Sequence, residues 1–265
     1  MKISYFSRRF FRSKGLLLLG VILVWEGLFR LELFSPLVFP SPWDVAVRMA
    51  EDLLSGKLLR GGAFSLLIIL AAFIPSLTVG FLMAFLSIRS SFVEGLTEKL
   101  SAIAHPLPGI ALLPLLIIWT GLGVHILILI VAHSVLWPFY VNVRSGFRSI
   151  PQLWIDVGRN NGFSRRREFL SILLPGSFPS IVSGLKIGWA RAWRGVISAE
   201  MIFGTIGNAG GLGWFIYNKR IFMDTPGMIG GLIFLMALGL AVENLVFGRL
   251  EDAIRRRWGG DYVHA

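Results

Sequence analysis

Long apolar blocks alternate with short polar connections along the chain. Six blocks are each close to the ~20 residues that a helix needs to cross the hydrocarbon core of a bilayer. They cover residues 15–34, 63–88, 101–119, 124–141, 178–202 and 227–247. Because apolar residues run through each block without alternating with polar ones, the pattern predicts helical spans and not the strands of a barrel. We therefore expect an all-α polytopic membrane protein, a single membrane domain with six transmembrane helices.

Composition agrees with this class. Of the 265 residues, 55% are hydrophobic and 15% are charged, whereas soluble domains carry roughly 25% charged residues. The absence of cysteine excludes disulfides and thiolate metal sites. A net charge of +11 is also found in nucleic-acid-binding proteins, but in so apolar a chain the positions of the charges matter more than their sum, and we expect no nucleic-acid partner.

The positive charges predict the orientation. Most of the 26 Lys and Arg residues lie before the first span, between spans two and three, between spans four and five, and after span six. By the positive-inside rule both termini are expected in the cytoplasm. The basic start of the chain also resembles a signal peptide, but the apolar block continues to Phe34 without a small-residue cleavage site, so we expect an uncleaved anchor. Glu26 and Arg30, one helical turn apart, predict a local ion pair.

The cytoplasmic connection over residues 149–175 carries the signals of two short helices. Ser149 with Gln152 three residues later reads as a capping box, and Pro151 is suited to a first helical turn. An apolar stripe then follows at helical spacing, formed by Ile150, Leu153, Trp154 and Val157.

The same connection also contains the signals that end a helix. Gly162 is placed to end the first helix as its C′ residue. A second helix can begin after Ser164 and stop before Pro175. Such a hairpin could lie flat on the inner leaflet with its arginines at anionic headgroups, or it could insert a rigid helix into a groove on a soluble partner.

The segment "DVGRNNGFSRRREFLSILLP" resembles the signature loop of permease subunits of binding-protein-dependent ABC importers. That pattern is Glu-Ala-Ala, three residues, Gly, nine residues, Ile-x-Leu-Pro. Gly162, Ile172, Leu174 and Pro175 match it in register, whereas Asp156, Val157 and Gly158 stand where Glu-Ala-Ala is usual. A glycine inside the helix costs about 1 kcal/mol relative to alanine.

The resemblance covers most of the chain. "FPSPWDVAVRMAEDLLSGKLLRGGAFSL", "HPLPGIALLPLLIIWTGLG", "GLKIGWARAWRGVISAEMIFGTIGNAGGLGWFI" and the tail "ENLVFGRLEDAIRRRWG" are similar to the nitrate, sulfonate, taurine and bicarbonate branch of this family. The resemblance implies a prokaryotic inner-membrane protein that works with a second permease copy, two ATP-binding subunits and an extracytoplasmic solute-binding protein. ATP and Mg would be bound by the ATPase, so no cofactor is expected in this chain, and the permease itself would not be an enzyme.

The resemblance also implies a role for the hairpin. The helix over 151–161 would dock in a cleft of the ATPase and pass its movement to spans three to five, with Pro175 and Pro179 setting the angle at which the hairpin enters the membrane. The residues expected to carry this coupling are Ile150, Leu153, Trp154, Asp156, Val157, Gly162, Ile172, Leu174 and Pro175.

Spans three and five are the expected walls of a translocation path. Span three carries Pro108 and Pro114, which are tolerated at membrane depth where neighbours or a water-filled cavity satisfy the backbone, although a simple packing kink is equally consistent with them. In span five, Gly184 and Gly188 have GxxxG spacing, which predicts close contact with another helix, in a dimer seam or within one subunit.

Arg191 and Arg194 are the most informative charges, because an arginine at a span centre costs about 2.5 to 3.5 kcal/mol on insertion scales. They could contact an anionic solute in passing, together with Glu200 on the same path. Alternatively, they could pair structurally with Glu200, Glu243 or helix carbonyls.

Other residues give weaker signals. His105 and His133 have no partner at metal-ligand spacing and are expected to be packed, hydrogen-bonded histidines. The glycine-rich "GNAGGLGW", residues 207–214, lacks a following Lys-Ser/Thr and is expected to be an external loop that meets the binding protein.

The solute itself stays open. An oxyanion such as a sulfonate, nitrate or taurine is the first expectation, and a neutral or cationic solute such as a vitamin precursor is the alternative. An intramembrane enzyme using Glu26, His105, His133 or Glu200 for proton chemistry is disfavoured, because no nucleophile and base stand at a suitable spacing.

Overall fold

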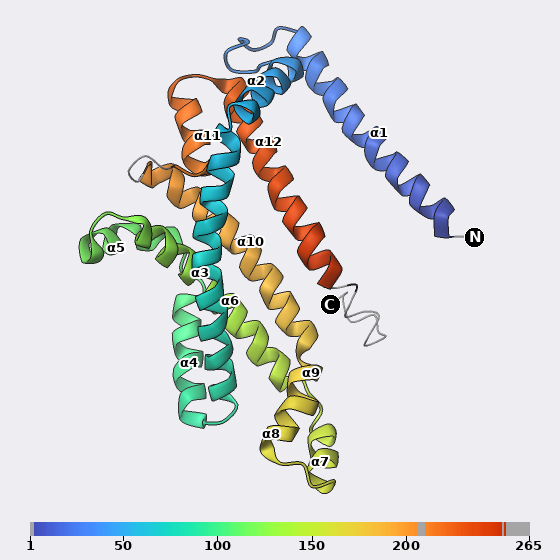
Figure 1. Cartoon of the computed structure of the whole chain (residues 1–265), viewed down its shortest axis with the longest axis vertical. Coiled ribbons are helices and arrows are strands. Elements are labelled where there is room, and N and C mark those ends of the chain that lie inside the picture. The colour runs from blue at the N-terminus through green and yellow to red at the C-terminus, as the bar shows by residue number, and fades with distance from the viewer. Residues whose placement is uncertain (1–2, 206–209, 251, 253–265) are drawn as a thin grey trace. The chain divides into compact units, whose positions relative to one another are not determined.

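The computed structural model describes residues 3–205, 210–250 and 252, with side chains from residue 16 onward, and this part of the chain is helical with no strand (Figure 1). The all-α prediction is confirmed for these residues. Contacts divide the chain into two compact units: Met1–Gly61 with Phe215–Met236, called unit 1 here, and Gly62–Trp214 with Ala237–Ala265, called unit 2.

Four of the predicted spans coincide with continuous helices. The helices are α1 (Ile3–Arg30), α3 (Lys57–Ser87), α6 (Val124–Arg148) and α10 (Phe178–Phe203). The first ends before the predicted limit at Phe34, and α6 runs beyond Val141. The last block forms α12 (Thr225–Val242), extended by the π-helical turn η3 (Glu243–Gly248).

Length and apolarity support several membrane crossings. Among the residues that the structure describes, three continuous helices are long and apolar enough: Lys57–Ser87, Val124–Arg148 and Thr225–Gly248. The number reaches five if two bent helix pairs each count as one span. In unit 1, Arg30 Nε lies 2.7 Å from Glu26 Oε1, which confirms the ion pair predicted on α1.

The third apolar block, predicted as a proline-rich span over 101–119, does not form one continuous helix. α4 (Ser91–Ala104) begins earlier than predicted, at the N-cap Ser90, and it is followed by η1 (Gly109–Leu112) and α5 (Leu113–Thr120). The two halves are bent by 89°. Pro106 and Pro108 both lack a backbone donor, and losing two helical hydrogen bonds within three residues favours a break at residues 105–108.

α6 and α10 pack along each other and form the core of unit 2 (Figure 1). Glycines permit the approach: a Cβ atom at Gly184 would lie 2.9 Å from Asn142 Cβ, and one at Gly188 would lie 3.3 Å from Val135 Cγ1. The GxxxG spacing therefore serves contact within the subunit, one of the two predicted alternatives. Towards the far end of α6, Phe139, Tyr140, Val143 and Phe147 are buried together.

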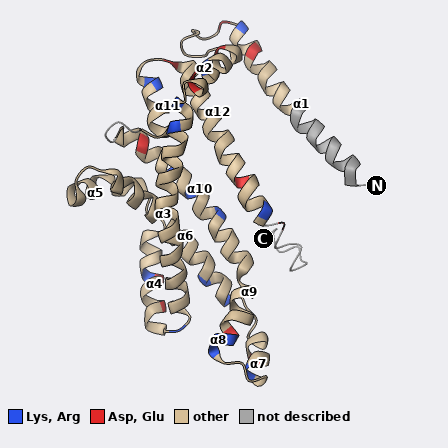
Figure 2. Cartoon of the chain, in the orientation of Figure 1, with Lys and Arg blue, Asp and Glu red and all other residues tan. Residues whose placement is uncertain are grey.

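A chain of short helices connects α6 to α10. These are α7 (Gln152–Asn160), α8 (Arg165–Glu168), the π-helical turn η2 (Phe169–Leu173) and α9 (Leu174–Gly176). α7 and the segment Arg165–Gly176 form the hairpin, and the latter meets α10 at a bend of 58°. Figure 2 shows lysine and arginine residues around α7 and α8.

In unit 1, charged side chains join α2 (Pro42–Leu54) to α11 (Leu212–Ile221) and the turn before α12. Arg48 Nη2 lies 2.8 Å from Asp224 Oδ2, and Lys219 Nζ lies 2.7 Å from both Asp52 Oδ2 and Asp224 Oδ2. Burial acts to raise the pKa of Asp224, but hydrogen bonds from Arg48 and Lys219 outweigh it and lower that pKa to about 2.

Candidate functional site

The face of α7 that points away from the hairpin is apolar and open. The exposed fractions of Leu153, Trp154 and Val157 are 68%, 53% and 51%. Ile150, by contrast, is buried, and its side chain lies against Gly176. The predicted stripe is thus divided between one buried anchor and three side chains that stay more than half exposed, although the Trp154 ring also lies near Gly176.

The start of α7 differs from the predicted capping box. Ser149 is the C-cap of α6, and its hydroxyl donates to the carbonyl of Gly146 at 2.8 Å. Pro151 occupies the N-cap position, and the Gln152 amide donates to Asp156 Oδ1 at 2.9 Å. The prediction was wrong because α6 continues to Arg148, which leaves no room for Ser149 to begin a helix.

The end of α7 is as predicted. Gly162 has a φ of +72°, the left-handed conformation that glycine adopts without strain. The Gly162 N–H donates to Arg159 O and the Phe163 N–H to Gly158 O, which is the Schellman arrangement that closes a helix. The hairpin therefore turns at a fixed point.

Gly158, the departure from the family pattern, is where the two arms of the hairpin touch. A Cβ atom at this position would lie 2.6 Å from Ile172 Cδ1 and 3.4 Å from the Phe163 ring. The lack of a side chain lets Ile172 pack directly on α7. This contact offsets part of the intrinsic cost of glycine in a helix.

A charged pair also holds the arms together. Arg159 Nε donates to Glu168 Oε2 at 3.0 Å and Arg159 Nη2 to Oε1 at 3.3 Å. Glu168 is buried, whereas Arg159 is largely exposed. Hydrogen bonding to Glu168 raises the pKa of the Arg159 guanidinium.

The prediction that the second helix stops before Pro175 was wrong. The chain passes through Leu174 and Pro175 in helical form to Gly176. The π-helical turn before it makes this possible. The Leu174 N–H donates to Phe169 O, so the backbone hydrogen bonds already follow the wider i→i−5 pattern of a π-helix at the residue before the proline. The break comes at Ser177, between Pro175 and Pro179, where the axis bends.

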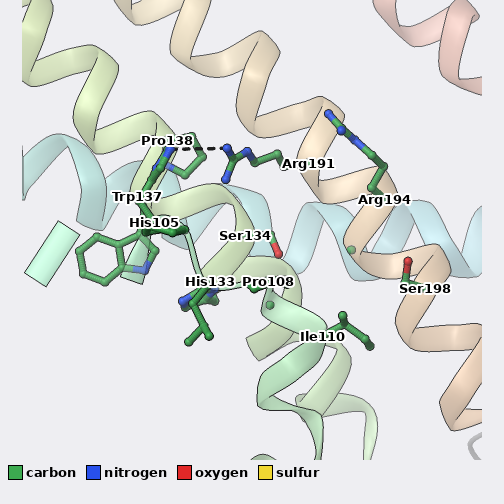
Figure 3. Close-up of a pocket in the computed structure, with 14 residues that line it drawn as sticks. His105, Pro108, Ile110, His133, Ser134, Trp137, Pro138, Arg191, Arg194 and Ser198 are labelled. Atoms are coloured by element: carbon green, nitrogen blue, oxygen red, sulfur yellow. Dashed lines mark hydrogen bonds between the residues drawn. The ribbon is translucent and has the colours of Figure 1, made fainter. Parts of the chain in front are cut away.

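The second candidate site is a cavity of about 420 Å³ in unit 2, called the α10 cavity here (Figure 3). It opens where the chain breaks after α4, with α6 and α10 as its other walls. Its polar lining residues are His105, His133, Ser134, Trp137, Arg191, Arg194 and Ser198, and Pro108 lines it as well.

Arg191 reaches across this cavity from α10. Its Nη2 lies 3.5 Å from His105 Nε2, and Figure 3 shows the guanidinium directed towards that imidazole. Arg194 Nε donates instead to the carbonyl of Ala190 at 3.2 Å. One predicted alternative, pairing with helix carbonyls, therefore describes Arg194 but not Arg191.

The cavity has cations without a carboxylate. Neither Arg191 nor Arg194 forms an ion pair with any described acidic residue, and no Asp or Glu is among the residues that line the cavity. His105 Nδ1, His133 Nδ1 and Trp137 Nε1 are buried without a hydrogen-bond partner in the described part. The lining is thus positively charged and has unused hydrogen-bonding nitrogen atoms.

Glu200 and Pro114 do not line this cavity. Glu200 is buried and accepts hydrogen bonds from the Ser65 hydroxyl at 2.8 Å and the Gly213 N–H at 2.8 Å. The Leu212 N–H in turn donates to Ser65 Oγ at 2.9 Å. Glu200 therefore caps the start of α11, where partial positive charge favours a carboxylate, and does not pair with Arg191 or Arg194 as one alternative supposed.

The position of Glu200 accounts for one glycine of the glycine-rich segment. A Cβ atom at Gly211 would lie 2.0 Å from Glu200 Oε1, so only glycine fits there. Residues 207–209 of the predicted external loop lie outside the described residues, and its last three residues, 212–214, already belong to α11.

Sequence reasoning missed the gathering of His105, His133 and Trp137 around Arg191. His105 is the C-cap residue of α4 at the break, whereas His133 and Trp137 lie on α6, which packs along α10. The available signal was the proline pair itself, since an interrupted helix at membrane depth is tolerated where it borders a cavity.

Comparison with known proteins gives consistent results. Residues 45–260 match the model of the family described as binding-protein-dependent transport system inner membrane component. A putative aliphatic sulfonates transport permease protein of Bacillus subtilis is 27% identical over 256 residues, which cover 96% of this chain and 91% of that protein. The taurine transport system permease protein of Escherichia coli is 29% identical and covers 84% of each chain. A putative aliphatic sulfonates transport permease protein of Escherichia coli is 28% identical, over 92% of this chain and 90% of that protein.

Proposed function

Because the chain belongs to the family of binding-protein-dependent transport system inner membrane components, we propose that it is the permease subunit that carries a small oxyanion, most suitably a sulfonate, across the inner membrane. The permease of an ABC importer is a multi-pass transport subunit and not an enzyme, and it works with an ATPase and a solute-binding protein. The observation that carries the choice of solute is Arg191, a guanidinium in a cavity without any acidic lining residue.

The physical argument concerns the cost of an unpaired charge. From Pro179 to Arg191 the helix rises by ~18 Å, which makes it difficult for the side chain to reach the cytosolic edge. A guanidinium does not deprotonate at physiological pH, so it needs an anion or dipoles close by. His105 is the one described side chain within hydrogen-bonding distance, and an oxyanion in transit would supply the missing charge.

The relatives support this class of solute without identifying it. Two are named for aliphatic sulfonates and one for taurine. A cationic solute would be repelled by Arg191 and Arg194, and a neutral solute would leave their charge uncompensated. These residues therefore favour the oxyanion over the vitamin-precursor alternative.

For coupling, we propose that α7 inserts its exposed apolar face into a groove of the ATPase, which binds ATP and Mg. An amphipathic helix laid in a hydrophobic groove is a common mode of recognition. Leu153, Trp154 and Val157 would be the anchors, and the ion pair Arg159–Glu168 and the contact of Ile172 with Gly158 would keep the helix rigid. Two copies of the permease, both with cytoplasmic termini, would complete the transporter.

The proposal for the solute can be tested by uptake of radiolabelled ethanesulfonate into proteoliposomes that contain the permease, its ATPase and its binding protein. Arg191→Gln should lower ATP-dependent uptake at least tenfold, and Arg191→Lys should retain part of it because the charge is kept. Arg166→Gln, which removes an exposed arginine of α8, is the matched control. Undiminished uptake by Arg191→Gln would contradict the proposal.

A further inference from the structure

A second cavity, also about 420 Å³, lies in unit 2 at the root of the hairpin and is called the root cavity here. It is bounded by the residues that follow α3, by the end of α6 and by both arms of the hairpin. The lining residues that bear on its chemistry are Arg89, Arg159, Arg165, Glu168, Phe147 and Phe169. None of them was assigned to this cavity by the sequence or by the proposed transport function.

The charges of the root cavity do not cancel. Arg159 is neutralised by Glu168 through two hydrogen bonds. Arg89 and Arg165 have no carboxylate within 4 Å in the described ranges. The Arg89 guanidinium lies over the Phe85 ring, 4.9 Å from its centroid, which orders the side chain without neutralising it. Two free guanidinium groups therefore border the same space.

The inner wall of the cavity is apolar. The Phe147 and Phe169 rings are 5.8 Å apart, and Phe85 packs on Phe169 with 4.8 Å between centroids. Ile88 and Leu173 add aliphatic surface. A cationic rim over an aromatic wall suits an amphiphile with an anionic head.

We propose that Arg89 and Arg165 bind a phosphate group, and that an anionic phospholipid of the inner leaflet carries it. Arg89 follows the end of α3, a membrane-length helix, in a connection whose positive charges predict a cytosolic location. Guanidinium groups bind phosphate oxygens through paired hydrogen bonds, and the inner leaflet attracts such basic clusters.

An occupant at this position would connect the end of α3 to the start of α8. The root of the hairpin would then be braced against the membrane domain on the side opposite the exposed face of α7. The inference needs the cytosolic placement of this loop but not the identity of the solute, so it stands or falls apart from the sulfonate assignment.

Native mass spectrometry of the purified full-length chain tests the proposal. The probes are phosphatidylglycerol, phosphatidylcholine with the same acyl chains, and inorganic phosphate. The variants are Arg89→Gln/Arg165→Gln, the corresponding double lysine variant, and the matched control Arg166→Gln/Arg249→Gln, which removes two exposed arginines that do not line the root cavity. Circular dichroism verifies that each variant is folded.

Phosphatidylglycerol should bind at least tenfold more tightly than phosphatidylcholine, and Arg89→Gln/Arg165→Gln should abolish this preference while the control keeps it. The double lysine variant should retain a part of it. Millimolar inorganic phosphate should displace phosphatidylglycerol from the wild type but not the weaker lipid binding that remains in the glutamine variant. That result would support the phosphate site and would show that free phosphate can also occupy it. Equal binding of the two lipids, or equal loss in the control, would overturn the proposal.

Discussion

Arg159 and Arg191 are the same residue type in opposite circumstances. Arg159 is on the exposed hairpin, yet it forms a two-pronged ion pair with a buried carboxylate. Arg191 lies midway along a membrane-length helix, yet within the described ranges its side chain has an imidazole as its one hydrogen-bonding partner. The first arrangement uses the charge to fix a structure, and the second leaves the charge available to something that enters the cavity.

The largest effect is expected from giving Arg191 a carboxylate partner, which would remove its difference from Arg159. Ser134 lines the α10 cavity and is half-buried, so Ser134→Asp would place a carboxylate near the guanidinium. We expect ATP-dependent uptake of ethanesulfonate to fall at least tenfold, close to the effect of Arg191→Gln, because the cavity would carry its own anion. Ser134→Asn is the isosteric control and should transport within about threefold of the wild type; an equal loss in both variants would show that shape and not charge is responsible.

The converse change frees Arg159. Glu168→Gln should leave the protein folded but loosen the contact between the two arms of the hairpin, because breaking a partly buried pair removes the hydrogen-bonded anchor of Arg159. We expect amide hydrogen exchange in α8 to accelerate severalfold, as mass spectrometry of proteolytic peptides would report. Asp156→Asn, which changes an exposed acid of α7, should not do so, and identical exchange in all three proteins would contradict the role given to the pair.

The smallest expected effect is on the pH dependence of stability, through the Asp224 carboxylate of unit 1. The pKa of Asp224 is about 2, below its ordinary value of 3.8. The carboxylate therefore stabilises unit 1 fully above about pH 4, and this contribution is lost as the pH falls towards 2. Arg48, Lys219 and Asp52 face it, and solvent screening limits the effect to about 1 kcal/mol or less. Thermal unfolding should show a smaller difference between pH 6 and pH 3 in Asp224→Asn than in the wild type; an unchanged difference would exclude Asp224 as its source.

Local signals in the sequence predicted much of the fold. Continuous apolar blocks marked α3, α6, α10 and α12, because span length is a property of each segment alone. Gly162 and Ser164 were also predictable, since a left-handed C′ residue and an N-cap act within a few residues. Errors arose where neighbouring elements competed, as at Ser149, which ends α6 and so cannot begin α7.

The site was less predictable than the fold. Arg191 was recognisable by its depth alone, but His133 and Trp137 line the same cavity because α6 packs along α10, and His105 because it follows α4 at the break. The partners of Glu200, Ser65 and Gly213, were not readable from the sequence, since tertiary packing brings them to it. Helix propensity marked Gly158 as unfavourable, but in the structure it is the point where Ile172 packs on α7. A propensity scale could not predict this, because it does not include contacts with residues of another helix.

The central claim is that the exposed face of α7 docks on a separate ATPase. The chain has no cysteine, so a single cysteine can be introduced at Leu153 and another, as the control, at the exposed Lys99 of α4. With a bifunctional maleimide and the cognate ATPase, Leu153→Cys should form a cross-linked permease–ATPase product whose yield changes with ATP, whereas Lys99→Cys should not. Cross-linking of the two positions with equal yield, or none from Leu153→Cys in an intact complex, would contradict the account.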